Sequence, residues 1–275
     1  MGKTIFVLID ACKYDLGTIY LSALEHRIDY GMGAKYKVQG ELPSLSRPMY
    51  ETLMTGLPMY RHGIANNDVC RRSCCDNVFR LVKESGLMTG AAAYYWMSEL
   101  YSHAPFDKNR DRIQVELRPE SLIDYGLFYW DDLYPDSHLY SDGEWIRKTY
   151  NPYFMMYHSM GVDEMGHLHG SESVEYAAAI AGVNDILSDL LPVWLEGGYN
   201  VVITADHGMN PQGIHGGNAW DQREVPLYLF CTKAIKGRYE DHYISQNNIA
   251  PLLCRLMEIP TGKEMMTELE IKMEV

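Results

Sequence analysis

The sequence lacks long hydrophobic runs and is poor in positive charge. Of its 275 residues, 24 are Lys or Arg and 37 are Asp or Glu, which gives a formal net charge of −13. Such a surface repels polyanions and argues against bulk nucleic-acid binding, but it permits a small anionic substrate where metal ions make a site locally positive. The N-terminal apolar run, residues 5–9, is too short for a signal sequence or a membrane span, and no other run is long enough. We therefore expect a cytoplasmic protein with no membrane partner.

Cysteine is also scarce, with six residues in the chain. In a reducing compartment these are expected to be free thiols. Three of them fall in "CRRSCC" (70–75), but this spacing matches no established zinc pattern. The cysteines therefore indicate neither a disulfide framework nor a soft-metal cluster.

Apolar segments with β-branched or aromatic character recur along the chain, and 47% of the residues are hydrophobic. Such near-continuous runs are typical of strands in a parallel sheet that is covered on both faces. Helical patterns lie between them, of which the longest, 174–198, ends at two glycines. The expected strands are 4–10, 88–96, 152–160, 200–206 and 225–231, and the other expected helices are 18–27, 48–55 and 245–259.

This alternation predicts an α/β protein, a three-layer α/β/α sandwich around a mostly parallel central sheet. The length suits one domain over 1–275. The segment 104–150 is polar and aromatic and shows little periodicity. We expect it to form a small inserted cap that helps to select the substrate.

Three of the expected strands end in residues that commonly bind metals. The first ends at Asp10, the third runs into "GVDEMGHLHG", and the fourth runs into "ADHGM", with "GIHGG" soon after. Because ligands of open α/β sheets bind at the carboxyl ends of the strands, these clusters should converge. The residues concerned are Asp10, Asp163, His167, His169, Asp206, His207 and His215.

Convergence would bring three carboxylates together, which is costly unless cations neutralise them. More than four ligands indicate two divalent ions, and mixed His/Asp ligation favours zinc, with manganese or iron as alternatives, over calcium. Each cluster also has a plainer interpretation on its own. Asp10 can cap a helix, "DHG" can be a turn, and "DEMGH" can be a solvated loop.

The segment "ELPSLSRPMYETLMTG" (41–56) offers four serine and threonine hydroxyls, those of Ser44, Ser46, Thr52 and Thr55, without a Gly-x-Ser-x-Gly elbow. Pro48 predicts a helix start at that residue, with Arg47 near the N-cap. Ser46 then lies just before a helix N-terminus, where an anion is favoured. Ser46 is therefore the candidate nucleophile, and an ordinary capping serine is the alternative.

The order of these motifs resembles the alkaline phosphatase superfamily, in particular its type I phosphodiesterase/nucleotide pyrophosphatase branch, which includes phosphonoacetate hydrolase. The resemblance rests on "SRPMYETLMTGLPMYRHGI" (46–64), "DEMGH" (163–167), "ADHGM" (205–209) and the late His215-Gly216, and it extends over roughly 3–60 and 152–260. The chain departs from this branch in carrying "DACK" (10–13) for "DGxR" and Ser for the usual Thr nucleophile. Tyr50 stands where sulfatases carry Arg, which argues against a sulfatase.

The resemblance implies a role for each matched residue. One ion would be held by Asp163, His167 and His215, and the other by Asp10, Asp206 and His207 together with the Ser46 hydroxyl. Asn67 in "HGIANND" would donate to a phosphoryl oxygen, and His169 has no counterpart. We also expect two substrate-binding residues: Arg47, which either binds phosphate or faces solvent, and Trp96, which either stacks on a substrate or packs in the rim.

The implied function is a two-metal hydrolase of phosphate esters (phosphodiesters, nucleotide pyrophosphates or phosphonates) acting through a phosphoseryl intermediate on a small anionic phosphorus-containing substrate. Diesters are favoured because no third metal set is evident for the extra charge of a monoester. The alternatives are a phosphomonoesterase, a metal-dependent phosphomutase or phosphotransferase on the same core, and a non-catalytic binding module. The sequence leaves the oligomeric state open.

Overall fold

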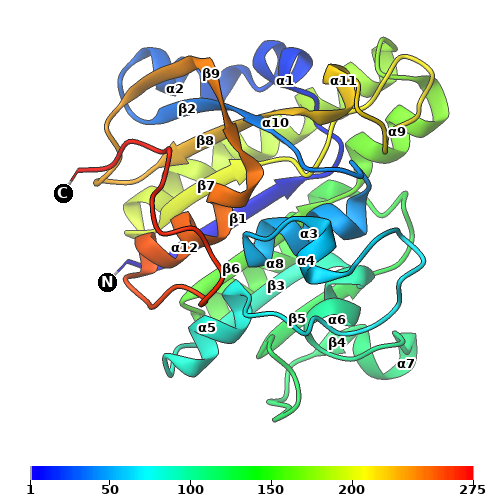
Figure 1. Ribbon diagram of the computed structural model, residues 1–275, viewed down its shortest axis with the longest axis vertical. Helices are drawn as coiled ribbons and strands as arrows, with labels where there is room; N and C mark the ends of the chain where they lie inside the picture. Colours follow the sequence, from blue (N-terminus) through cyan, green and yellow to red (C-terminus); the bar gives the residue numbers. More distant parts are fainter. Residues whose placement is uncertain (1, 275) are drawn as a thin grey trace.

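The computed structural model describes residues 2–274 and contains one nine-stranded sheet. The strand order is β4-β5-β3-β6-β1-β7-β8-β2-β9 (Figure 1). The neighbours from β5 to β7 are all parallel, whereas β8 and β4 run antiparallel to their neighbours. The strands are β1 Thr4–Ile9, β2 Ala34–Gln39, β3 Thr89–Tyr94, β4 Ile113–Gln114, β5 Tyr125–Tyr129, β6 Phe154–Ser159, β7 Asn200–Thr204, β8 Glu224–Phe230 and β9 Gly237–Ser245.

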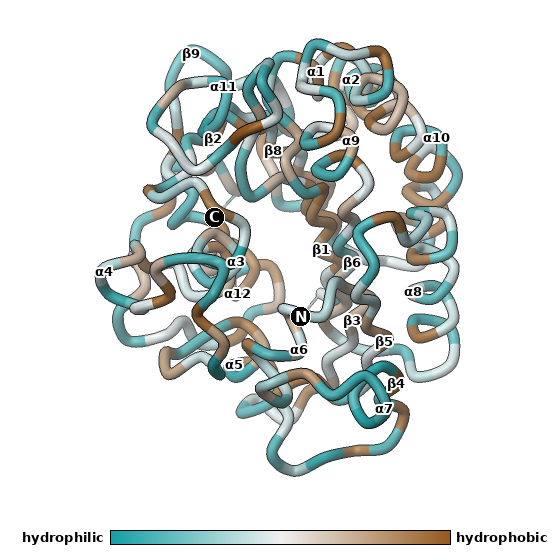
Figure 2. The backbone as a smooth tube through the Cα atoms, turned by 90° about the vertical axis from the view of Figure 1, so that its right-hand side faces the viewer, coloured by the Kyte–Doolittle hydropathy of each residue, from teal (hydrophilic) through white to brown (hydrophobic). Residues whose placement is uncertain are grey.

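Helices cover both faces of this sheet, which gives the expected three layers (Figure 2). One face carries α1 Tyr14–Tyr20, α2 Ser22–Asp29, α8 Asp136–Tyr150, α9 Gly161–His169 and α10 Val174–Glu196. The other carries α3 Ser46–Thr55, α4 Met59–His62, α5 Val78–Glu84, α6 Tyr95–Tyr101 and α12 Ile249–Met257, which follows the 3₁₀ turn η1 Gln246–Asn248. The short helices α7 Lys108–Asp111 and α11 Trp220–Arg223 lie in connections.

The core lies on the central strands because these strands are apolar on both faces. Every residue of β1, β3 and β6 is buried, as the near-continuous apolar runs predict. All five expected strands are present, within two residues of the expected limits. The α/β/α class and the mostly parallel sheet are therefore confirmed.

Two strands near one edge of the sheet, β2 and β9, were not predicted. Their sequences, "AKYKVQ" and "GRYEDHYIS", are too polar to read as core strands. Lys35 of β2 is nevertheless fully buried, because its ammonium group lies 2.7 Å from a carboxylate oxygen of Glu25 and 2.8 Å from one of Glu240. Paired charges can thus replace apolar residues at a buried strand position.

The segment 104–150 is not the separate cap that we expected. Its strand β5 pairs in parallel with β3 inside the sheet, and α8 packs on β3 and β6. The part before β5, with α7 and β4, lies at the sheet's outer edge (Figure 1). The periodicity was weak because the strand, "YGLFY", is short and aromatic and is flanked by acidic loops.

Helix α3 begins two residues earlier than predicted, at Ser46, with Leu45 as the N-cap. Pro48 is then the third helical residue, where its missing N–H costs nothing because first-turn donors have no partner within the helix. Pro48 disfavours helical backbone at Arg47, the residue before it. Arg47 is nevertheless helical, because its tertiary contacts, described below, outweigh this preference.

Among residues 2–274, one helix, α10, is long and apolar enough to cross a membrane by length and composition, in contrast to the expectation that no apolar run is long enough. About a third of its most apolar window is buried (33%). The helix packs against β7, α1, α2, α8 and α9 on one face of the sheet.

Candidate metal centre and nucleophile

Three neighbouring strands bring the predicted metal ligands to one edge of the sheet. Strands β6, β1 and β7 are adjacent and parallel, so their carboxyl ends lie side by side (Figure 1). Asp10 follows β1, helix α9 follows β6, and Asp206 follows β7. Two groups that could each hold a metal ion result, Asp10 with Asp206 and His207, and Asp163 with His167 and His215.

The first group is fully buried and includes the hydroxyl of Ser46. Nε2 of His207 lies 3.1 Å from Oγ of Ser46, 3.2 Å from Oδ2 of Asp206 and 3.5 Å from Oδ1 of Asp10. Ligands of a tetrahedral ion, each about 2.0–2.1 Å from the metal, lie about 3.3–3.4 Å apart. The separations therefore fit four ligand atoms around one ion.

The second group is more open. Nε2 of His167 lies 3.2 Å from Nε2 of His215 and 3.4 Å from Oδ2 of Asp163, and Nε2 of His215 lies 3.8 Å from Oδ1 of Asp163. Hydrogen bonding to Asp163 raises the pKa of His167 to about 9, whereas burial and the charge of His207 lower that of His215 to about 4. The rings of His207 and His215 stack at 3.8 Å, so the two groups are neighbours.

All three histidines turn the same ring nitrogen towards the site. Their Nδ1 atoms lie within hydrogen-bond distance of backbone carbonyls: His207 of Gly208 (2.9 Å), His167 of Gly213 (2.8 Å) and His215 of Ser44 (2.9 Å). A proton on Nδ1 that is donated to a carbonyl leaves Nε2 as a free lone pair. This is the tautomer that metal-binding histidines adopt.

Buried carboxylate oxygens in the site also fit bound cations. Oδ1 of Asp10, Oδ1 of Asp163 and Oδ2 of Asp206 are buried and have no hydrogen-bond partner among residues 2–274. Buried acceptors without partners are costly, and a divalent cation is the partner that this donor set suits.

The pKa values of these three aspartates also indicate that the site needs positive charge. Burial, with the charge of Asp10 adding to it, raises the pKa of Asp206 well above its usual range and raises that of Asp163. Burial opposes ionisation of Asp10 as well, but a hydrogen bond from His158 and the charge of His207 hold its pKa low. Three carboxylates in one buried site thus need cations in order to be ionised together.

Among the serine and threonine hydroxyls of the segment 41–56, Ser46 is the one that enters the site. Ser44 instead donates to the carbonyl of Gly217 at 2.8 Å, so it serves to fix a loop. Thr52 lies 3.1 Å from His62, and Thr55 donates to the carbonyl of Glu51 one turn earlier, as expected for residues inside a helix.

Asn67 lies against the start of helix α3. Its Oδ1 accepts a hydrogen bond of 3.0 Å from the backbone N–H of Arg47, one of the first-turn donors that lack a helical partner. The amide NH₂ is then the group that can donate to a phosphoryl oxygen. The role of Asn67 toward a phosphoryl oxygen stays a prediction.

Arg47 is buried and does not face solvent. Its Nη2 lies 2.7 Å from Oε2 of Glu99, its Nη1 donates to the carbonyl of Val69 at 3.1 Å, and its guanidinium carbon lies 4.6 Å from the centre of the Trp96 ring. Its Nε has no hydrogen-bond partner among residues 2–274. Trp96 is the second residue of α6 rather than the end of a strand, and its ring packs against both Arg47 and Tyr50.

Two residues at the site were missed by sequence reasoning, Tyr50 and His158. Both bind the carboxylate of Asp10, Tyr50 through its hydroxyl and His158 through Nε2 at 3.0 Å. The available signals were a tyrosine one helical turn after Ser46 and a lone histidine within the apolar strand "FMMYHS". His169, which ends α9, belongs to neither metal group.

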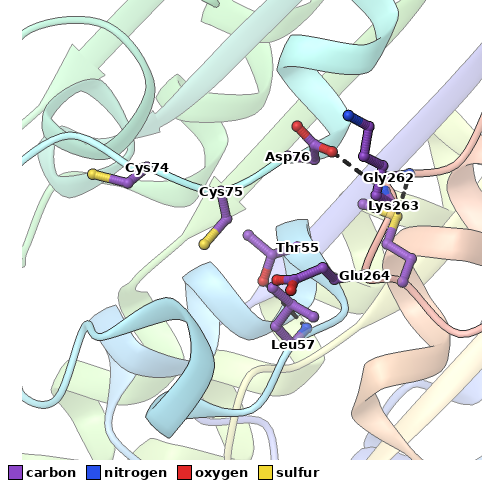
Figure 3. Close-up of a pocket in the computed structure, with 9 residues that line it drawn as sticks. Thr55, Leu57, Cys74, Cys75, Asp76, Gly262, Lys263 and Glu264 are labelled. Carbon is purple, nitrogen blue, oxygen red and sulfur yellow. Dashed lines mark hydrogen bonds between the residues drawn. The ribbon is translucent and has the colours of Figure 1, made fainter.

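A separate cavity of about 420 Å³ lies at the other end of α3 (Figure 3). Thr55 lines it together with Cys74, Cys75, Asp76 and a C-terminal segment, 262–265. Within residues 2–274, no metal group includes these cysteines. Cys74 and Cys75 carry free thiols, and the residues that line the cavity include none of the two metal groups.

The fold is similar to those of a solved phosphodiesterase and a solved alkaline phosphatase. Murine ectonucleotide pyrophosphatase/phosphodiesterase 5 superposes with a TM-score of 0.73 at 13% identity, covering 94% of this chain and 96% of the other. The alkaline phosphatase PafA superposes with a TM-score of 0.72 at 11% identity, with 98% of each chain covered. These likenesses show a shared fold.

The family model described as type I phosphodiesterase/nucleotide pyrophosphatase matches residues 4–224, so the chain belongs to that family and the predicted resemblance to it is confirmed. Among curated proteins, the human GPI ethanolamine phosphate transferase 3, catalytic subunit, is 26% identical over 282 residues, covering 94% of this chain and 24% of that protein. The human GPI ethanolamine phosphate transferase 2, catalytic subunit, is 23% identical, covering 96% of this chain and 27% of that protein. The chain thus spans about a quarter of the length of these relatives.

Proposed function

We propose that this chain is a two-metal phosphoesterase that cleaves phosphodiesters through a covalent intermediate on Ser46. The observation that carries the proposal is the position of the Ser46 hydroxyl, 3.1 Å from Nε2 of His207 and inside the buried group that also contains Asp10 and Asp206. Divalent ions held by the two groups, with zinc favoured by the mixed His/Asp donors, would supply Lewis-acid chemistry that acidifies the hydroxyl and withdraws charge from phosphoryl oxygens.

Residues of the chain would act both in forming the covalent intermediate and in breaking it down. Oγ of Ser46 loses its proton and attacks phosphorus, the bond to the leaving alkoxide breaks, and the alkoxide takes up a proton as an alcohol. The amide of Asn67 donates to a non-bridging oxygen, where charge develops. Water, or an acceptor alcohol in a transferase, then attacks phosphorus and gives up a proton, the Ser46–phosphorus bond breaks, and Oγ of Ser46 takes up a proton.

Diesters and related singly charged esters are favoured over monoesters. A monoester carries one more negative charge, and residues 2–274 form no third metal group that would neutralise it. In addition, Oδ2 of Asp10 is not free to bind a third ion, because the hydroxyl of Tyr50 and Nε2 of His158 already bind it. The substrate would be a small anionic phosphorus compound, as proposed from the sequence.

A phosphotransferase is the second candidate, because the curated relatives that cover 94% and 96% of this chain are named ethanolamine phosphate transferases. The two candidates share the first step and differ in the second, in which either water or an acceptor alcohol attacks. The transferred group of this second candidate would be ethanolamine phosphate, as in the names of those relatives.

The test is to follow the covalent step and its product. With zinc or manganese and a chromogenic phosphodiester, intact-mass spectrometry of rapidly quenched protein should show an adduct on Ser46. Ser46→Ala should lose both adduct and turnover, whereas Ser44→Ala should retain the adduct. Adding acceptor alcohols then separates the candidates, because a transferase forms a new ester and a hydrolase forms the free acid. Turnover by Ser46→Ala near the wild-type rate would overturn the proposal.

A further inference from the structure

The two oxygens of the Asp10 carboxylate have different surroundings. Oδ1 faces Nε2 of His207 at 3.5 Å and has no hydrogen-bond partner among the described residues 2–274. Oδ2 is bound twice, by the hydroxyl of Tyr50 and by Nε2 of His158 at 3.0 Å. One oxygen is thus directed at the metal group and the other is held by the protein.

Both partners of Oδ2 act as donors. Nδ1 of His158 is buried and has no hydrogen-bond partner within residues 2–274, so a neutral ring carries its proton on Nε2, towards Asp10. The Tyr50 hydroxyl has one proton, and the carboxylate oxygen is the acceptor within reach that binds it most strongly, since its other contact is the sulfur of Met160 at 3.5 Å.

The two donors are themselves fixed by packing. The rings of Tyr50 and His158 are fully buried and meet edge to face at 4.7 Å. The carbonyl of His158 accepts a hydrogen bond of 2.9 Å from the hydroxyl of Tyr129. Tyr50 lies one turn after Ser46 in α3, and His158 lies beside Leu8 in the strand next to β1. The carboxylate is therefore held between the nucleophile helix and the neighbouring strand.

We propose that Tyr50 and His158 are positioning residues that make Asp10 a ligand through Oδ1 alone. By binding Oδ2, they fix the rotation of the carboxylate and close its outer oxygen to any further cation. They also tie this ligand to the helix that carries Ser46. This inference rests on the proposed function, because it requires an ion in the group of Asp10, Asp206 and His207.

The experiment measures zinc binding by competition with a chromogenic chelator, in wild type and in a His167→Ala background that weakens the second group. Tyr50→Phe deletes one donor and should weaken zinc binding at the Asp10 group about 10-fold to 100-fold, the range found for outer partners of metal ligands. His158→Leu should do the same. His158→Gln, whose amide nitrogen can replace Nε2, should retain more of the affinity than His158→Leu.

Tyr140→Phe is the matched control, because the Tyr140 hydroxyl is buried and has no hydrogen-bond partner among residues 2–274. It should leave zinc affinity unchanged. Circular dichroism of the zinc-free variants establishes whether they fold. If either the Tyr50 or the His158 variant does not fold, the zinc affinity of the other variant tests the positioning role.

The outcomes separate this inference from the proposed function. If wild type binds no divalent ion, the proposed function fails. If wild type binds two ions and folded Tyr50→Phe and His158→Leu keep the wild-type affinity for both, the positioning role is wrong. Equal losses at both groups would also overturn it, because they would show general damage.

Discussion

The guanidinium of Arg47 pairs with the carboxylate of Glu99 between helices α3 and α6, with Nη2 2.7 Å from Oε2. Both side chains are buried. Oε1 of Glu99 also accepts from the backbone N–H of Phe106 at 2.9 Å and from the thiol of Cys70 at 3.2 Å. Arg47 thus ties the start of α3 to α6 and to two loops.

Arg47→Met should therefore destabilise the protein by about 3–5 kcal/mol, because it leaves Glu99 buried without its counter-charge. The double variant Arg47→Met, Glu99→Gln should recover most of this loss, since no unpaired charge remains. Urea denaturation measures both. If Arg47 instead binds the substrate phosphate, Arg47→Met would leave the unfolding free energy unchanged and raise KM.

Substitution of Asn67 should separate its hydrogen bond to the start of α3 from its predicted hydrogen bond to the substrate. Asn67→Asp keeps an acceptor for the backbone N–H of Arg47 but loses the NH₂ donor and adds a negative charge. Turnover should fall at least about 100-fold to 1,000-fold, as when a transition-state donor is removed. The thermal unfolding temperature should stay close to that of wild type. Asn67→Ala should lower both, and equal turnover of Asn67→Asp and wild type would show that the amide does not act on the substrate.

Removal of divalent ions should lower the stability of the protein. An ion present at 100 times its Kd contributes about 2.7 kcal/mol, since it binds the folded state only. Thermal unfolding with a chelator, and again after zinc is restored, measures this gain. His167→Gln should reduce the gain, whereas His169→Gln, two residues further along α9 and outside both metal groups, should not. An identical gain in both variants would contradict the assignment of His167.

The ionisation of Glu144 should make the stability of the protein depend on pH, independently of the metal groups. Burial alone would raise the pKa of Glu144, but hydrogen bonds from Arg147, Trp194 and Tyr157 lower it to about 2. Because the folded pKa lies below the unfolded value, the ionised carboxylate stabilises the protein above about pH 4.5, and this contribution is lost as the pH falls towards 2.

A lowering from 4.5 to about 2 corresponds to about 3 kcal/mol. Glu144→Gln should therefore be less stable than wild type at pH 7, and the difference should shrink as the pH falls from 4.5 to 2. Denaturation at several pH values measures it. Arg147→Gln should show a smaller loss with the same trend, and a difference that does not change with pH would contradict this origin.

The sequence alone determined the central strands and the residues that follow them. Runs such as 5–9 and 201–203 are apolar at every position because both faces of the sheet are covered, and this pattern can be read without a structure. Parallel strands end at one edge, so the convergence of Asp10, Asp163 and Asp206 followed from topology. The position of Ser46 near a helix start followed from Pro48, although the helix begins two residues earlier.

The tertiary structure decided what depends on contacts between distant segments. Glu99, which pairs with Arg47, is 52 positions away, and no local pattern relates the two. The role of His158 depends on a neighbouring strand that places it beside Asp10. The inclusion of β5 and α8 in the core, and the burial of Lys35 in β2, likewise depend on what packs around weakly patterned segments. Local residue types set where strands and helices form, whereas packing between them sets which polar groups become partners.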